Sequence, residues 1–152
     1  KNILHLYSNH KWTGPADHAL NLVAWQKKTS GLNPVLACGH KKGTQNYLRE
    51  KARERQLPCL DSLFLNKHLN WKIAPDVISL KKIVARHGID VIHCHQDNDT
   101  LPAVAAGLGR QVVRTNYDGQ PSDLNFRQRI SYRQPIGRFP VLEFGSYLFQ
   151  QF

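Results

Sequence analysis

The sequence has no long hydrophobic run, few cysteines and about half as much acidic as basic charge. No apolar stretch approaches the roughly 18 residues of a membrane-spanning helix. The first residues show no signal-peptide pattern, because Lys1 and Asn2 lead into only five mostly apolar positions. These absences argue against a membrane span and a secreted mini-protein. With 152 residues, 41% of them hydrophobic, the chain is expected to form one globular domain with its own core.

The three cysteines, Cys38, Cys59 and Cys94, are odd in number, widely spaced and placed beside apolar residues. Small secreted domains that depend on disulfides carry cysteines in even numbers and at close spacing. We therefore expect reduced, half-buried thiols of the kind found in cytosolic proteins.

Basic residues dominate the charged set. Twenty-one Lys and Arg against eleven Asp and Glu leave a formal net charge of +10. Such an excess favours phosphorylated small molecules, nucleic acid or an acidic membrane surface as partners, although a basic domain can also lack an anionic partner. Nucleic acid is not expected, because the aromatic residues do not interleave with the basic ones as they do in base-stacking surfaces.

Hydrophobic patterning predicts strands that alternate with helices. Strands are expected at 3–7, 34–38, 57–60, 89–93 and 111–115. Helices are expected from a Thr13 cap to Gly31 and over 44–56, 76–87 and 99–108. This alternation predicts βαβ units with a parallel sheet, which is an α/β fold. Residues 120–152 show no clean period, and only the aromatic-rich segment 144–152 is compatible with a short helix.

The loop after the first predicted strand is a candidate anion site. Lys11, Thr13, Gly14 and Pro15 stand directly before a helix N-terminus, whose dipole favours negative charge. Gly14 would let a ligand approach the backbone closely. The same residues also fit an ordinary helix entry capped by Thr13, so both interpretations stay open.

A second polar cluster follows the predicted strand 89–93. His93 and His95 point to the same face of a strand, and Asp97 and Asp99 follow them. These side chains could hydrogen-bond sugar hydroxyls or phosphate, or the histidines could simply pack at the edge of the core. A third interpretation is a transition-metal site, although a histidine pair without a spaced third ligand is weak support for one.

The third cluster lies at the end of the predicted strand 111–115. Arg114 could bind phosphate with two parallel hydrogen bonds, and Tyr117 and Asp118 follow it, with Asp118-Gly119 also suiting an ordinary turn. In a parallel sheet, all three clusters would lie along the edge formed by the carboxyl ends of the strands. We therefore expect one polar ligand site there.

Four segments resemble a known family: the opening ILHLY, the loop and helix WTGPADHALNLVAWQKKTSG, the stretch GIDVIHCH, and VVRTNYDG. They cover roughly residues 2–119 and resemble the N-terminal half of GT-B glycosyltransferases of family 4. These are retaining, nucleotide-sugar-dependent enzymes of cell-envelope glycan synthesis. The resemblance implies a Rossmann-like, mostly parallel sheet flanked by helices over 1–119. Residues 120–152 would then form an irregular linker or crossover segment.

In this family, the N-terminal domain mainly binds the acceptor and a C-terminal domain binds the donor. Residues 120–152 are too few to form that donor domain, so this chain by itself is expected to be inactive. The resemblance implies a nucleotide sugar and a glycan or lipid-linked acceptor as partners, no metal cofactor, and a cytoplasmic location. Lys51, Arg53 and Arg55 could rest on the anionic inner face of the membrane, although a solvated charged helix face is the simpler interpretation.

The resemblance also implies roles for individual residues. The donor phosphates would face Lys11, Thr13, Gly14 and Pro15. The roles in catalysis and acceptor binding would fall to the polar strand ends: catalytic His93, Arg114 and Asp118, and acceptor-binding His95, Asp97 and Tyr117.

Two features depart from the family pattern. Tyr117-Asp118 stands where relatives usually have His-Asp, and the first loop has one glycine followed by proline where many relatives have two glycines. These departures leave two other functions open. One is a non-catalytic module that binds phosphosugars or nucleotides, and the other is a metal-dependent hydrolase that uses His93, His95, Asp97 and Asp99.

Overall fold

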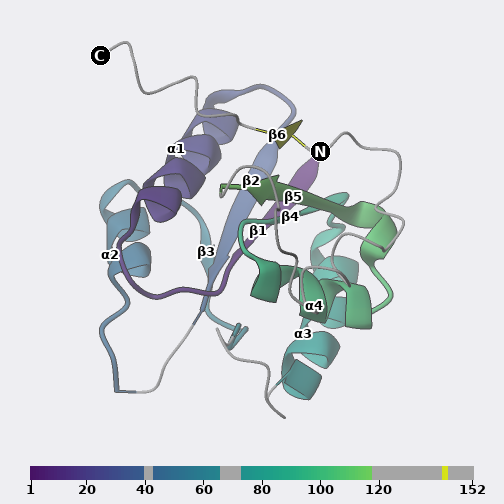
Figure 1. Ribbon diagram of the computed structural model, residues 1–152. Coiled ribbons are helices and arrows are strands. Elements are labelled where there is room, and N and C mark those ends of the chain that lie inside the picture. The colour runs from purple at the N-terminus through teal and green to yellow at the C-terminus, as the bar shows by residue number, and fades with distance from the viewer. Residues whose placement is uncertain (40–42, 66–72, 118–141, 144–152) are drawn as a thin grey trace.

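The computed structural model describes residues 1–39, 43–65, 73–117 and 142–143, and in this part strands and helices alternate along the chain (Figure 1). The strands are β1 (Asn2–Tyr7), β2 (Asn33–Cys38), β3 (Cys59–Leu60), β4 (Val91–Cys94), β5 (Val112–Asn116) and β6 (Leu142–Glu143). The helices are α1 (Gly14–Lys28), α2 (Tyr47–Glu54), α3 (Ile73–His87), α4 (Asp97–Ala105) and the short 3₁₀ helix η1 (Gly109–Gln111).

The strands form one sheet in the order β3-β2-β1-β4-β5-β6, and every neighbouring pair is parallel. The chain runs outward from β1 through β2 to β3, and α3 then carries it back to β4 on the other side of β1. The order thus reverses between β1 and β4, which is where open α/β sheets bind ligands. The predicted Rossmann-like α/β fold with a parallel sheet is confirmed.

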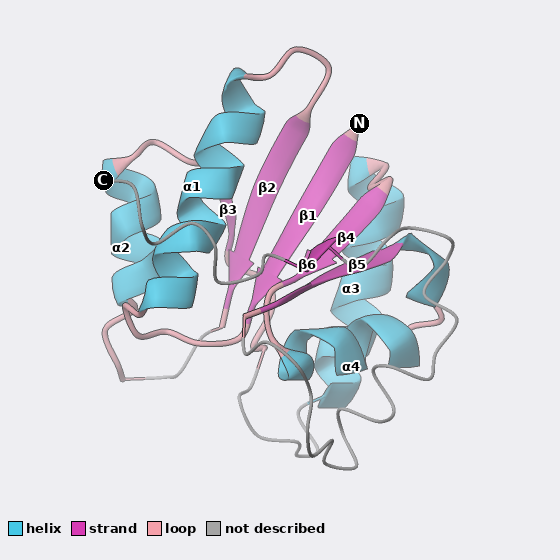
Figure 2. Ribbon diagram, turned by 45° about the horizontal axis from the view of Figure 1, so that its top comes forward, coloured by secondary structure: helices cyan, strands magenta, loops and turns pink. Residues whose placement is uncertain are grey.

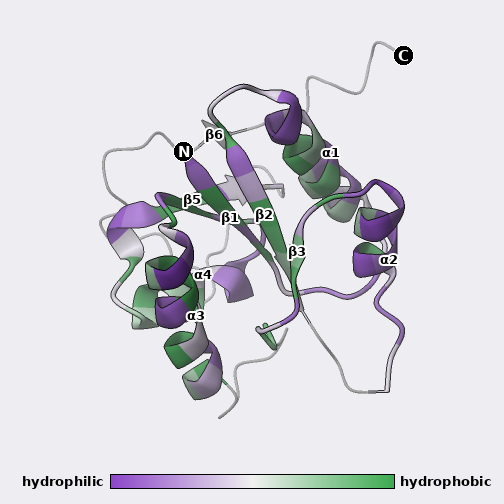
Figure 3. Ribbon diagram, turned by 180° about the vertical axis from the view of Figure 1, so that it is seen from behind, coloured by the Kyte–Doolittle hydropathy of each residue, from purple (hydrophilic) through white to green (hydrophobic). Residues whose placement is uncertain are grey.

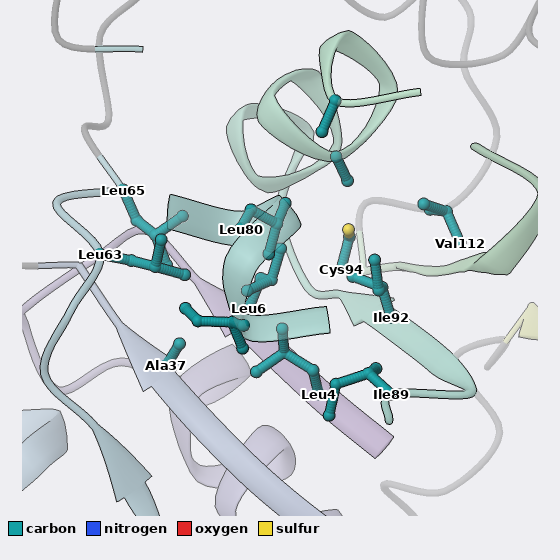
Figure 4. Packing of buried hydrophobic residues seen from close by; sticks show 13 residues of the cluster. Leu4, Leu6, Ala37, Leu63, Leu65, Leu80, Ile89, Ile92, Cys94 and Val112 are labelled. Carbon is teal, nitrogen blue, oxygen red and sulfur yellow. The ribbon is translucent and has the colours of Figure 1, made fainter. Parts of the chain in front are cut away.

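Helices cover both faces of the sheet (Figure 2). Because side chains alternate along a strand, β1 sends Leu4 and Leu6 to one face and His5 and Tyr7 to the other. Leu4 and Leu6 pack with Leu80 of α3 in the core that Figure 4 shows. Tyr7 belongs to a second core with α1 and α2. Helix α2 has little apolar surface and is mainly hydrophilic in Figure 3.

The element boundaries shift from the predicted ones for local reasons. Helix α4 begins at Asp97 because Asp99 Oδ2 accepts backbone N–H groups of His95 and Gln96, at 3.2 and 2.9 Å. Helix α2 begins later than predicted, where Asn46 Oδ1 accepts the N–H of Arg49 at 3.0 Å. The predicted helix over 144–152 lies outside the described residues. The division into 1–119 and 120–152 stays a prediction, although Leu142–Glu143 pairs with β5.

All three cysteines are free. Cys38 and Cys94 are buried and Cys59 is half-buried, so the expected burial is met or exceeded at each position.

Candidate functional site

The ends of β1, β4 and β5 lie side by side at the carboxyl edge of the sheet, so the described residues of the three predicted polar clusters share this edge. The loops are joined directly. Ser8 Oγ, after β1, donates to Gln96 Oε1, after β4, at 2.8 Å. The backbone N–H of His95 donates to the carbonyl oxygen of Leu6 at 3.2 Å.

The first loop leads into α1 without the predicted side-chain cap. Thr13 occupies the N-cap position, but its hydroxyl is hydrogen-bonded to the Tyr7 hydroxyl, 3.0 Å away, and makes no bond to the first turn. The capping prediction is therefore wrong for this side chain, because a phenol at the end of β1 competes for it. A Cβ placed on Gly14 would meet no atom within 4 Å. The space beside Gly14 at the start of α1 is thus open.

Three histidines lie together beneath this edge, on the α1 face of the sheet. His5 of β1 pairs in register with His93 of β4, and His95 follows on the same face. Their exposed fractions are 0%, 5% and 1%. The His93 and His95 rings are stacked with centroids 4.3 Å apart, and those of His5 and His95 with centroids 5.3 Å apart. At this burial none of the three offers a face to a ligand the size of a sugar or a nucleotide.

A chain of hydrogen bonds runs from α1 through two of these rings. The Gln26 side-chain oxygen can only accept, so His5 Nε2–H donates to it at 2.7 Å. A neutral His5 then accepts at Nδ1 from His95 Nε2–H, at 3.0 Å. His95 in turn accepts at Nδ1 from the Tyr117 hydroxyl, at 2.8 Å. The Gln26 oxygen thereby sets the position of every proton in this chain.

A second branch reaches Tyr117 through Thr115. Thr115 opposes the effect of burial, which raises the pKa of Tyr117. His93 Nε2 and Thr115 Oγ1 are hydrogen-bonded at 2.7 Å. Tyr117 is half-buried and its ring stacks on that of His18 in α1, with centroids 6.3 Å apart. The histidines therefore fix a tyrosine at the edge of the sheet, next to the start of α1.

The buried histidines are neutral. Burial lowers the pKa of His5 to about 3 and that of His93 to about 4, and it holds the pKa of His95 well below the usual range. Repulsion among the imidazolium forms lowers the pKa values of His5 and His95 further. Each ring therefore carries one donor and one acceptor nitrogen, as the hydrogen-bond chain requires.

Arg114 lies on the opposite face from the histidines. It pairs in register with Cys94, and its guanidinium forms an ion pair with Asp97 at the start of α4. The structure therefore does not bring Arg114 to His93, with which catalysis was predicted. Asp97, predicted to bind the acceptor, is engaged by Arg114. Asp118, the third predicted catalytic residue, lies outside the described residues.

Asp99 is fully buried and holds the turn after β4 through its bonds to backbone N–H groups. Its burial raises the pKa of the carboxyl to about 7. The two carboxylates of the predicted hydrolase site therefore do not join His93 and His95, since Asp97 pairs with Arg114 and Asp99 with the backbone. Within the described residues, the group that could hold a metal is His5, His93 and His95.

The cations of α2 that were considered for membrane contact have acidic neighbours. Lys51 Nζ lies 2.7 Å from Glu54, Arg53 lies 3.8 Å from Asp61, and Arg55 lies 2.9 Å from Asp17. Arg55 also lies over the ring of Trp12 in the first loop, 5.6 Å from its centroid. These pairs favour a solvated charged face. No helix among the described residues is long and apolar enough to cross a bilayer.

Sequence reasoning missed three members of the histidine network: His5, Gln26 and Thr115. Two signals were present. His5 is the polar residue inside the apolar run ILHLY, and Gln26 lies on the face of α1 that carries Ala19 and Val23. Placing them beside His93 and His95 required the register of β1 with β4, which the sequence pattern does not contain.

The chain matches no protein-family model and no curated protein sequence. Its structure is similar to that of MurG from Acinetobacter baumannii, with a TM-score of 0.64 and 11% identity over 94% of this chain and 44% of MurG. It is also similar to UDP-GlcNAc 2-epimerase from Neisseria meningitidis bound to UDP-GlcNAc. There the TM-score is 0.55 and the identity 12%, over 76% of this chain and 32% of the epimerase.

Both structures have the GT-B fold, so this chain has the fold of a Rossmann-like α/β domain of the kind found in GT-B proteins. At this level of identity the likeness establishes the fold. The chain spans less than half the length of either protein.

Proposed function

We propose that this chain is the N-terminal, acceptor-side domain of a retaining glycosyltransferase. The enzyme would transfer a sugar from a nucleotide-sugar donor to a cell-envelope glycan or a lipid-linked acceptor, with the donor bound largely by a second domain outside this chain. The observation that carries the proposal is the uncapped start of α1, which stands beside the histidine-anchored Tyr117 at the switch point of the sheet. The likeness to MurG and to an epimerase bound to UDP-GlcNAc supports it.

The start of α1 would serve the donor diphosphate. Its dipole, the backbone N–H of Gly14 and the exposed Lys11 all favour an anion, and the open space beside Gly14 admits one. Such positive charge would stabilise the departing nucleoside diphosphate electrostatically, so transfer is proposed to need no metal at this step. Thr13 and Pro15 would shape the loop around the phosphates.

Tyr117 would contact the sugar. Its proton is directed inward to His95, so toward a ligand its oxygen acts as an acceptor and suits a sugar hydroxyl. His93 and His95 are buried and would act on the sugar through Thr115 and Tyr117 as positioning residues. We also propose the predicted roles for three further residues. Asp118 would orient sugar hydroxyls, and Asp97 would contact the acceptor. Arg114 would break its ion pair with Asp97 and bind phosphate.

The test uses the complete gene product, including any domain that follows this chain. The protein would be mixed with radiolabelled nucleotide sugars and a lipid or glycan extract, and label transfer would be measured. We expect transfer from one nucleotide sugar. A complete protein that neither binds nor consumes any nucleotide sugar would contradict the proposal.

Binding without turnover would support the second candidate, a non-catalytic module for nucleotide sugars or phosphosugars. The likeness to an epimerase bound to UDP-GlcNAc supports nucleotide-sugar binding in both candidates. Isothermal titration with nucleotide sugars, run beside the transfer assay, separates the two.

A cytoplasmic protein with peripheral contact to the membrane remains part of the proposal. Sedimentation with anionic vesicles at low and high salt tests the contact, since electrostatic binding weakens with ionic strength. Equal binding at both salt concentrations would remove the electrostatic contact.

A further inference from the structure

The histidine cluster has the inner dimensions of a metal site. One nitrogen from each of His5, His93 and His95 lies within 4.8 Å of one from each of the others. His5 Nδ1 and His95 Nε2 are 3.0 Å apart. Zinc–nitrogen bonds of about 2.0–2.1 Å in a tetrahedron separate the ligand nitrogens by about 3.3 Å. The His5–His95 pair thus needs to open by only a few tenths of an ångström.

The outer nitrogens have the partners that metal-bound histidines usually have. One nitrogen of each ring lies against a side-chain oxygen: His5 Nε2 on Gln26 at 2.7 Å, His93 Nε2 on Thr115 at 2.7 Å, and His95 Nδ1 on Tyr117 at 2.8 Å. In metal sites such partners fix the tautomer and orientation of each ligand. These three oxygens would hold the three rings in place around an ion.

The ligand atoms indicate which metals fit. Three imidazoles without a carboxylate suit zinc and its neighbours in the first transition row, and they do not suit magnesium, calcium or manganese. The rings are neutral, which is the protonation state that binds a metal. We propose that His5, His93 and His95 hold one zinc ion, with water in the fourth position.

The ion would stabilise the fold and would not meet the sugar. Its ligands are between 0% and 5% exposed, so a sugar substrate cannot reach it, and the proposal is independent of the glycosyltransferase function. Binding would join β1 and β4 directly and α1 and β5 through Gln26 and Thr115. Zinc binding would release no proton from the cluster. The His95 proton would move from Nε2 to Nδ1, and the Tyr117 hydroxyl would rotate so that its proton no longer points at His95. His93 turns from its stacked position so that its Nδ1 lone pair faces the ion.

The test measures metal content and affinity. The complete, tag-free protein would be purified after growth in zinc-supplemented medium and analysed by mass spectrometry of its metals. We expect about one zinc per chain. The metal-free protein, titrated with cobalt as a spectroscopic substitute, should develop the intense visible bands of a tetrahedral site. Fewer than about 0.1 equivalents of zinc, together with no cobalt spectrum, would overturn the proposal.

Variants separate this site from adventitious binding. His5→Gln should lose the metal, whereas the matched change His87→Gln, at an exposed position on α3, should retain it. Gln26→Leu removes an outer partner and should weaken zinc binding about 10–100-fold. Equal zinc content in the wild type and His5→Gln would contradict the proposal.

Nitrogen-15 NMR of the wild-type rings gives a test that does not depend on a variant that folds. The metal-free protein should carry the His95 proton on Nε2, and zinc should move it to Nδ1. An unchanged tautomer on saturation with zinc would also count against the site.

Discussion

His5 and His93 lie directly opposite each other on the two central strands, and both side chains face α1. The two residues are 88 positions apart in the chain and meet at the point where the strand order reverses. Around them, Gln26, His95 and Tyr117 form a buried polar network that ends at the ligand edge of the sheet. A fully bonded network of this kind specifies one arrangement of its members, because any broken bond leaves a buried polar group unpaired.

The network should make the metal-free protein sensitive to acid. Folded, His5 and His93 have pKa values of about 3 and about 4, and unfolded they titrate near 6.5. Between these values the unfolded chain binds more protons, so the free energy of unfolding falls as the pH drops below about 6.5. Each histidine contributes up to about 1.4 kcal/mol per pH unit, and the loss ends below its folded pKa.

Urea unfolding of chelated protein at pH 7.5, 6 and 5 measures this slope. Asp99 acts in the opposite sense, because its raised pKa of about 7 favours the folded state as the pH falls from 7 toward 4. Asp99 contributes equally in the wild type and in His93→Gln, so its effect cancels when the two proteins are compared. The unfolding free energy of the variant should fall less steeply as the pH drops. Identical slopes in both proteins would mean that His93 is not buried in its neutral form.

Tyr117→Phe should weaken both the fold and the site. The change removes the donor to His95 Nδ1 and leaves a buried acceptor unpaired, at a cost of about 1–3 kcal/mol. It should also lower nucleotide-sugar or acceptor affinity in the complete protein. Tyr47→Phe, on the exposed surface of α2, is the matched control and should change neither quantity. Chemical unfolding and calorimetric titration provide the two readouts.

Gly14→Ala should fold normally and bind the donor poorly. The added methyl meets no atom within 4 Å, but it projects into the space before the start of α1 where phosphate is proposed to lie. We expect a change in unfolding free energy below about 1 kcal/mol and a clear loss of nucleotide-sugar affinity. Gly109→Ala, another open position, controls for the extra methyl. If Gly14→Ala bound the nucleotide sugar as tightly as the wild type, the phosphate would not lie at the start of α1.

Gly39→Ala should be strongly destabilising. A Cβ at this position would lie 2.3 Å from the carbonyl oxygen of Ser8 and 2.8 Å from that of Leu65, and both contacts are to backbone. Neither neighbour can turn away as a side chain would, so the loops must separate. We expect a loss of more than about 3 kcal/mol in unfolding free energy, measurable as a lower midpoint in urea. A midpoint within error of the wild type would show that these loops move apart freely.

The fold could be predicted because each element carries its own signal. The apolar runs of β1 and β2 and the spaced apolar residues of α1 are local patterns, and their alternation leads to a parallel sheet. The site could be predicted only in part. The spacing of His93 and His95 shows a shared face, but whether Arg114 joins them depends on the register of β4 with β5. That register aligns Arg114 with Cys94 and turns it to the other side.

Thr13 illustrates the second reason. A threonine before a helix predicts a cap from sequence alone, yet Tyr7, six residues earlier, takes its hydroxyl. His5 and Gln26 could not be predicted for the same reason. Each is an ordinary strand or helix residue in the sequence, and only the fold places its distant partner beside it.

The central position of β1 has a consequence for synthesis on the ribosome. β1 is made before the other described strands, and its partner β4 follows more than 80 residues later. Until then one edge of β1 has no neighbour, and His5 has neither His93 nor His95 beside it. Such long-range pairing is slow to form and leaves an exposed strand edge while it is pending. The nascent chain thus depends on β4, made much later, to cover the open edge of β1, and truncation before β4 should yield an aggregating product.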